Sequence, residues 1–240
     1  MATFALIHGA AHGAWCYDLL ASELVRLGHA AIAMDTPVED TTVGLREHAA
    51  AVATAVAAAD VQRPLVVVAH SAGGAFLPIA ASACGAQAMI FLCAVVPVEG
   101  LSGVDQRGLD GSMVTMPAER FDRDDLGRTL APPDFARDYY YDDCDPQLAA
   151  WAIARLRRQA PNVMAEPFPE GAWPDIPAAS ILCTEDRCVG PDWSRRVSLE
   201  RLGVAARELP GGHSPFLSRP AALAELLDAI TNEMFPRTRD

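Results

Sequence analysis

The sequence has 240 residues, enough for one domain of moderate size, and 51% of them are hydrophobic while 21% are charged. This composition excludes an intrinsically disordered chain, because disorder requires few apolar residues and a large net charge. The formal net charge of −12 repels phosphate groups and anionic lipids, so we expect a small neutral molecule as partner rather than a nucleic acid or a membrane.

All 19 basic residues are arginine, so mechanisms that need a lysine amine are excluded. No apolar run reaches the roughly 18 residues of a membrane-spanning helix, and the chain starts with an expected strand instead of a basic and apolar leader. The six cysteines are scattered without metal-type spacing, which is typical of free buried thiols in a reducing compartment. We therefore expect a cytoplasmic protein that uses no metal and no cofactor.

Short apolar runs alternate with longer segments of helical period along most of the chain. This alternation is typical of a parallel sheet covered on both faces, so the predicted fold class is α/β with a mostly parallel six-stranded sheet. The predicted strands are Thr3–Ile7, Ala30–Met34, Leu65–Ala69, Ala88–Ala94, Ala179–Cys183 and Ala205–Leu209. The predicted helices between and after them are Trp15–Leu27, Leu45–Ala59, Gly74–Ala83, Pro191–Leu202 and Pro220–Met234.

The alternation breaks between Val98 and Pro177, where the chain holds acidic clusters, several prolines and one predicted helix, Pro146–Gln159. A structureless loop of that length is uncommon in a compact domain, so we expect a partly helical cap over the C-terminal edge of the sheet. The predicted organisation is a core of residues 1–97 and 171–240 with a cap of residues 98–170. Substrate selection is expected in the cap.

The stretch VVVAHSAGG, residues 66–74, joins a predicted strand directly to a serine and a predicted helix. In the nucleophile elbow G-x-S-x-G, a sharp turn raises the serine hydroxyl above the sheet, and small neighbours let strand and helix approach. Here Ala69 replaces the first glycine and adds one methyl group. Taken alone, the stretch fits Ser71 as a nucleophile and equally as the N-cap of a helix.

A serine nucleophile needs a base, and the base needs an acid to orient it; candidates for both follow in the sequence. His213 lies in a glycine-rich loop after the last predicted strand, and Asp186 follows the strand before it. Three such residues at the ends of parallel strands favour a catalytic triad over a loop histidine and a solvated aspartate. Glu99, after the fourth predicted strand, is the alternative acid.

An oxyanion hole needs two backbone N–H groups that face the developing negative charge. The first predicted strand leads into a glycine-containing loop that can present the N–H of Ala10, and Ala72 can supply the second N–H. His8 and His12 in the same loop are expected to hold it by hydrogen bonds instead of acting as bases.

The same loop also suggests a dinucleotide-binding unit, because Asp35 follows the next predicted strand. The spacing G-x-G-x-x-G is absent, however. A short-chain dehydrogenase also needs a Tyr-x-x-x-Lys pair, which Tyr139, Tyr140 and Tyr141 cannot form in a chain without lysine. An NAD-dependent dehydrogenase is therefore disfavoured.

Three segments together resemble the α/β-hydrolase superfamily: LIHGAAHGAWCYDLLASELVRLGHAAIAMD, VVVAHSAGG and ILCTEDRC. They are similar to the branch that holds plant methyl-ester esterases of the methyl salicylate and methyl jasmonate type, hydroxynitrile lyases and related bacterial esterases. The chain order serine, aspartate, histidine is also that of α/β-hydrolases. The resemblance implies hydrolysis of a small carboxylic ester by Ser71, Asp186 and His213, with Ala10 and Ala72 as the oxyanion hole.

Two other functions in this superfamily remain as alternatives. Hydroxynitrile lyases resemble the pattern H-T-I-C-H-G and carry a lysine after the catalytic histidine, whereas this chain has Gly9 and Ser214 at those positions. Some α/β-hydrolases are non-catalytic receptors for small molecules, and an apparently complete triad counts against that function. Large apolar side chains suggest an apolar or aromatic substrate: Phe76, Met113, Met116, Phe121, Phe135, Tyr139 and Trp151.

Overall fold

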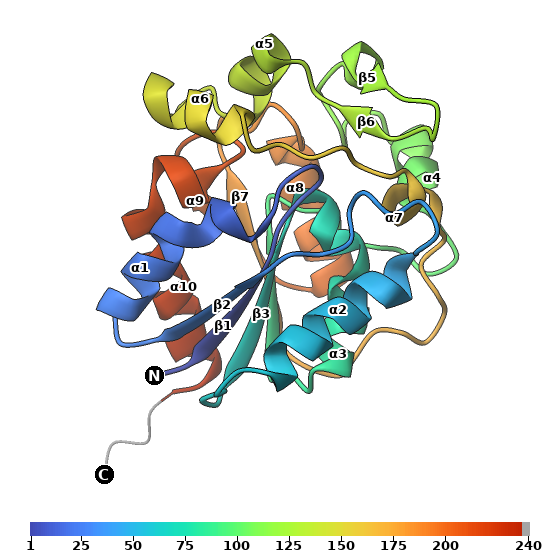
Figure 1. Cartoon of the computed structure of the whole chain (residues 1–240). Coiled ribbons are helices and arrows are strands. Elements are labelled where there is room, and N and C mark those ends of the chain that lie inside the picture. The colour runs from blue at the N-terminus through green and yellow to red at the C-terminus, as the bar shows by residue number, and fades with distance from the viewer. Residues whose placement is uncertain (237–240) are drawn as a thin grey trace.

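In the computed structural model, which describes residues 1–236, six strands form one sheet in the order β2-β1-β3-β4-β7-β8. Every neighbouring pair is parallel, so the C-terminal ends of all six strands meet at one edge of the sheet (Figure 1). The predicted α/β class is confirmed. The strands are β1 (Thr3–Ile7), β2 (Ala30–Met34), β3 (Leu65–His70), β4 (Ala88–Leu92), β7 (Ala178–Cys183) and β8 (Arg207–Leu209).

Most strand ends agree with the sequence prediction to within one residue, and two differ by two residues for structural reasons. β4 stops at Leu92, two residues earlier than expected, because Cys93 adopts a φ of +46° and turns the chain out of the sheet. β8 starts two residues later than expected because it is an edge strand that pairs with β7 over the short register from Ile181 to Cys183.

Helices cover both faces of the sheet, and each face has its own hydrophobic core. In α2 the buried residues Leu45, Ala49, Val52 and Val56 recur at helical spacing, which places one apolar stripe against the sheet. One face carries η1 (Ala14–Tyr17), α1 (Asp18–Arg26), α9 (Pro215–Ser218) and α10 (Pro220–Met234). The other carries α2 (Leu45–Ala57), η2 (Ser71–Phe76), α3 (Leu77–Ala83), α8 (Pro191–Val197) and η5 (Ser198–Leu202).

The segment between β4 and β7, residues 93–177, adds no strand to the six-stranded sheet and is called the inserted segment below. Figure 1 shows its α5, α6 and the β5–β6 hairpin grouped beyond the C-terminal edge of the sheet. Its elements are α4 (Gly103–Leu109), η3 (Ala118–Arg120), β5 (Asp122–Arg123), β6 (Thr129–Leu130), α5 (Pro133–Phe135), η4 (Ala136–Tyr140), α6 (Pro146–Ile153) and α7 (Asn162–Ala165).

The helix predicted over Pro146–Gln159 is too long, because α6 ends at Ile153. Beyond it, the Arg157 N–H donates a hydrogen bond of 2.7 Å to the carbonyl oxygen of Ala11. The backbone of Gln159 also exchanges two hydrogen bonds with Thr129. These contacts with distant parts of the chain replace the next helical turns, and the sequence pattern contains no sign of them.

The helices are short compared with the thickness of a lipid bilayer. A helix needs about 20 residues to span the hydrocarbon core, whereas α10 has 15. Within residues 1–236, no helix has both the length and the apolar character required to cross a membrane.

Candidate active site

Ser71 lies at the sharp turn where β3 ends and η2 begins. Its φ is +51°, a left-handed conformation that costs a non-glycine residue roughly 1–2 kcal/mol. The N-cap position of η2 is His70, with no side-chain capping bond. Ser71 is therefore not the N-cap of this helix, and its strained backbone is typical of a nucleophile elbow.

Close contacts between this turn and neighbouring backbone atoms show which of the small residues around Ser71 must be glycine. A Cβ atom on Gly73 would lie 2.8 Å from the His8 carbonyl oxygen, and one on Gly74 would overlap the Val95 carbonyl oxygen. Ala69 is fully buried within the ladder of β3, yet its methyl group is accommodated. The alanine at the first elbow position is thus compatible with the turn, whereas the two following glycines are sterically required.

His213 lies in the loop after β8 and connects the other two candidate residues. Its Nε2 is 3.1 Å from Ser71 Oγ, and its Nδ1 is 2.9 Å from Asp186 Oδ2. A carboxylate oxygen only accepts hydrogen bonds, so Nδ1 carries the hydrogen and Nε2 is left to accept from the serine hydroxyl. His213 is 3% exposed and Asp186 is 6% exposed, which shields these bonds from water.

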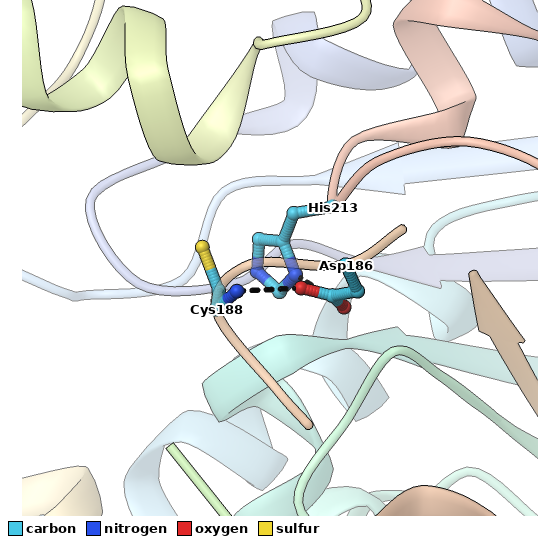
Figure 2. A group of neighbouring side chains, drawn as sticks. All are labelled: Asp186, Cys188 and His213. Carbon is cyan, nitrogen blue, oxygen red and sulfur yellow. Dashed lines mark hydrogen bonds and ion pairs between the residues drawn. The ribbon is translucent and has the colours of Figure 1, made fainter. Parts of the chain in front are cut away.

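Asp186 is fixed by the backbone of its own loop. Its Oδ1 accepts hydrogen bonds of 2.7 Å from the Cys188 N–H and 3.0 Å from the Val189 N–H. Figure 2 shows the Asp186 carboxylate beside the His213 ring, with a dashed line from one of its oxygens to the Cys188 backbone nitrogen. Glu99, the alternative acid, is exposed and accepts a hydrogen bond from the N–H of Gly171 instead.

One group within residues 1–236 has the composition of a metal site: potential ligand atoms of Asp186, Cys188 and His213 lie within 4.8 Å of one another. Direct contact between Asp186 Oδ2 and His213 Nδ1 leaves no room for an ion between them. Burial raises the pKa of the Cys188 thiol well above its usual value, and Sγ donates to the Tyr139 carbonyl oxygen. These residues therefore do not fit a metal ion.

The candidate oxyanion-hole residues both lie close to Ser71. A Cβ atom on Gly9 would be 2.9 Å from Ser71 Cβ, so the loop carrying Ala10 approaches the serine closely. Ala72 is the second residue of η2, where N–H groups have no acceptor within the helix. Among the residues that the structure describes, the Ala10 N–H has no hydrogen-bond acceptor either. Both N–H groups are available to a ligand.

The loop histidines hold the backbone, as the sequence predicted. His8 Nδ1 is 2.9 Å from the Gly9 carbonyl oxygen, while its Nε2 accepts from the Thr36 N–H. His12 Nδ1 is 2.7 Å from the Ala10 carbonyl oxygen. Burial lowers the pKa of His8 to about 4 and that of His12 to about 3, so both are neutral near pH 7.

Two residues of the site carry no recognisable sequence signal. His70 Nε2 is 2.9 Å from the carbonyl oxygen of His213, and Gln159 Oε1 accepts a hydrogen bond of 3.0 Å from the Ala11 N–H. His70 occupies a variable position of the elbow motif, and Gln159 is 148 residues from its partner. Only the folded chain brings these groups together.

Several of the expected pocket residues belong to the cores instead. Phe76, Met113 and Phe135 are at most 2% exposed, which leaves little surface for a substrate. Phe135 also stacks on Tyr139 with ring centroids 4.4 Å apart. These residues stabilise the layers around the site, and they do not support the inference of an aromatic substrate.

A family model described as the alpha/beta hydrolase family matches residues 4–226. Alpha/beta hydrolase nvfD of Aspergillus novofumigatus is 30% identical over 152 residues, which is 60% of this chain and 57% of that protein; the match thus spans little more than half of that relative. The probable esterase PIR7A of Oryza sativa subsp. indica is 26% identical over 252 residues, 93% of this chain and 94% of that protein. The crystal structure of polyneuridine aldehyde esterase matches with a TM-score of 0.80 at 20% identity, covering 96% of this chain and 99% of that one, which shows a shared fold. Since the family model covers most of the sequence, the chain belongs to the alpha/beta hydrolase family.

Proposed function

We propose that this protein is a serine esterase that cleaves small carboxylic esters through an acyl-enzyme. The observation that carries the proposal is the hydrogen-bonded chain from Ser71 Oγ through His213 to Asp186, with distances of 3.1 and 2.9 Å. These three residues lie at the C-terminal edge of the parallel sheet, which is where ligands bind in such folds. The names of the rice relative and of the matched crystal structure, both esterases, also support it.

In the first half of the proposed reaction, Ser71 Oγ attacks the ester carbonyl carbon while its proton moves to His213 Nε2. The carbonyl electron pair moves onto oxygen, and the N–H groups of Ala10 and Ala72 donate hydrogen bonds to that oxyanion. Collapse of the tetrahedral intermediate breaks the carbon–oxygen bond to the alcohol. His213 returns its proton to the leaving alcohol, and Asp186 stabilises the imidazolium between the two transfers.

In the second half, water replaces the alcohol. His213 Nε2 takes a proton from water as its oxygen attacks the acyl carbon, and the same N–H groups receive the second oxyanion. The intermediate expels Ser71 Oγ, which regains the proton from His213. The products are a carboxylic acid and the free enzyme, and no metal or cofactor takes part.

The proposed division of the chain gives these steps to a core of residues 1–97 and 171–240, and substrate selection to a cap of residues 98–170. Support comes from the location of the inserted elements beyond the sheet edge (Figure 1). Within that segment, the Tyr140 ring lies 6.3 Å from the His213 ring, measured between centroids. The inserted segment therefore contributes a side chain beside the proposed base.

Two alternatives give different products, so one screen separates them. The purified protein is offered p-nitrophenyl esters of increasing acyl length, aromatic methyl esters and mandelonitrile. We expect release of p-nitrophenol with a preference among acyl groups. Cyanide release from mandelonitrile without ester cleavage would indicate a lyase, and binding of esters without any turnover would indicate a receptor.

A further inference from the structure

We infer that the inserted segment orients the oxyanion hole, with Tyr141 and Gln159 as positioning residues that act on Ala10 through the loop. This inference rests on the proposed esterase function. It assigns a second task to the inserted segment besides substrate selection. The argument uses three hydrogen bonds that join this segment to residues 9–12.

The orientation of the Ala10 N–H is determined by the peptide groups on both sides of it. In the planar trans peptide between Gly9 and Ala10, the N–H points opposite to the carbonyl oxygen. His8 holds that carbonyl oxygen from the core side. The next peptide, between Ala10 and Ala11, is held at its carbonyl by His12 and at its N–H by Gln159. Any rotation of the Ala10 N–H would therefore break one of these bonds.

Tyr141 determines how His12 holds the loop. The Ala10 carbonyl only accepts, so His12 Nδ1 carries the hydrogen and Nε2 presents a lone pair. Tyr141 OH lies 2.8 Å from this Nε2 and donates to it. Both side chains are 1% exposed, so water does not replace either partner. Burial also raises the pKa of Tyr141, which therefore keeps its donor hydrogen.

Gln159 and Arg157 hold the strained residue of the loop, Ala11. Ala11 has a φ of +62°, which a non-glycine residue adopts at a cost of roughly 1–2 kcal/mol. Its N–H donates to Gln159 Oε1 over 3.0 Å, and its carbonyl oxygen accepts from the Arg157 N–H over 2.7 Å. The Gln159 backbone is itself anchored by reciprocal hydrogen bonds of 2.7 and 2.9 Å with Thr129. Without these bonds, the loop would relax away from the left-handed conformation.

The expected effect is on the transition state more than on substrate binding. The oxyanion exists only in the tetrahedral state, so a misaligned Ala10 N–H lowers kcat while KM changes little. A neutral hydrogen bond contributes on the order of 1 kcal/mol. We expect each substitution that removes one of the two side-chain bonds to lower kcat about fivefold to tenfold.

The test compares Tyr141→Phe and Gln159→Met with Tyr17→Phe in the full-length protein. Tyr17 is a matched control because its buried hydroxyl also donates a 2.8 Å bond, to the Ile7 carbonyl oxygen, outside the loop. For each protein, kcat, KM and the affinity for a trifluoromethyl ketone, which forms a tetrahedral adduct with serine, are measured. Tyr141→Phe and Gln159→Met should lose kcat and ketone affinity in parallel, whereas Tyr17→Phe should lose only stability.

The outcomes separate this inference from the proposed function. If the wild type neither cleaves esters nor binds the ketone, the esterase proposal fails. If the wild type is active while Tyr141→Phe and Gln159→Met keep its kcat and ketone affinity, only the inference is overturned. The inference is also overturned if Tyr17→Phe lowers kcat as much as Tyr141→Phe and Gln159→Met do. Circular dichroism identifies a variant that fails to fold, and the other variant then decides.

Discussion

The Nε2–H of His70 donates a hydrogen bond of 2.9 Å to the main-chain carbonyl oxygen of His213, and the two imidazole rings lie 4.5 Å apart between centroids. His70 is the last residue of β3 and precedes Ser71. The segment that bears the proposed nucleophile therefore also holds the loop that bears the proposed base. Burial keeps the pKa of His70 well below its usual value, so its neutral ring is a fixed donor.

The substitution His70→Leu should lower kcat/KM about tenfold, because the His213 carbonyl loses its donor and the loop gains freedom. Folding stability should change less than activity, since the Nδ1 of His70 is buried without a partner among the described residues and leucine removes it. Steady-state kinetics and urea unfolding measure the two effects. Unchanged kcat/KM would show that the bond does not position His213.

The substitution Ser71→Ala should lower kcat by a factor on the order of 10⁶, because members of a triad act as a unit. The matched control is Ser82→Ala, which removes an exposed serine of α3 and should leave hydrolysis unchanged. Both variants are assayed with the best p-nitrophenyl ester. Near-normal activity of Ser71→Ala would exclude Ser71 as the nucleophile.

The substitution Asp186→Asn should lower kcat by a factor on the order of 10⁴ while leaving KM almost unchanged. The Asp186 carboxylate accepts from His213 Nδ1 and from two backbone N–H groups, and an amide can accept with only one of its two ends. An amide N–H facing His213 favours the wrong imidazole tautomer. Glu185→Gln is the matched control, because Glu185 is exposed and next in sequence. Equal rates for both variants would argue against this role of Asp186.

The stability of the fold should fall as the pH drops from about 6.5 towards 4. Burial lowers the pKa of His8 to about 4 and of His12 to about 3, from an ordinary value of 6.5. In this window the unfolded chain binds protons that the folded chain rejects, so these two histidines alone lower the free energy of unfolding by up to about 3 kcal/mol per pH unit. Buried His70 acts in the same direction. Urea unfolding at pH 7.5, 6 and 5 measures this decrease. These pH values lie above the range in which most carboxylates titrate. Equal stability at pH 7.5 and 5 would contradict the buried neutral state.

The two small residues that flank Ser71 should respond in opposite ways. Ala69→Gly removes a buried methyl group and should cost about 1–2 kcal/mol of unfolding free energy, with kcat/KM within about threefold of wild type. Gly73→Ala places a Cβ 2.8 Å from the His8 carbonyl oxygen and should displace the loop that carries the proposed oxyanion-hole residue Ala10, lowering kcat more than tenfold. Kinetics and urea unfolding of both variants test this contrast. The prediction would be wrong if Gly73→Ala were more active than Ala69→Gly.

Local sequence patterns were sufficient for the sheet and for most of the helices. β1, β2 and α10 have the predicted bounds to the residue, because an unbroken apolar pattern and, in α10, a proline in the first turn define them locally. The inserted segment was predictable only as partly helical. Its chain after Ile153 is directed by hydrogen bonds to Ala11 and Thr129, which a local pattern does not contain.

The sequence alone determined that Ser71, Asp186 and His213 each follow a strand, and a parallel sheet brings all such positions to one edge. The tertiary structure decided that Asp186 and not Glu99 lies beside His213, and that Ser71 adopts a φ of +51°. It also decided the hydrogen bonds that join the loop of residues 9–12 to the inserted segment. The reason is physical: the positions of strands along the chain follow from local hydrophobic periodicity. Hydrogen bonds between distant side chains instead depend on positions to within a few tenths of an ångström.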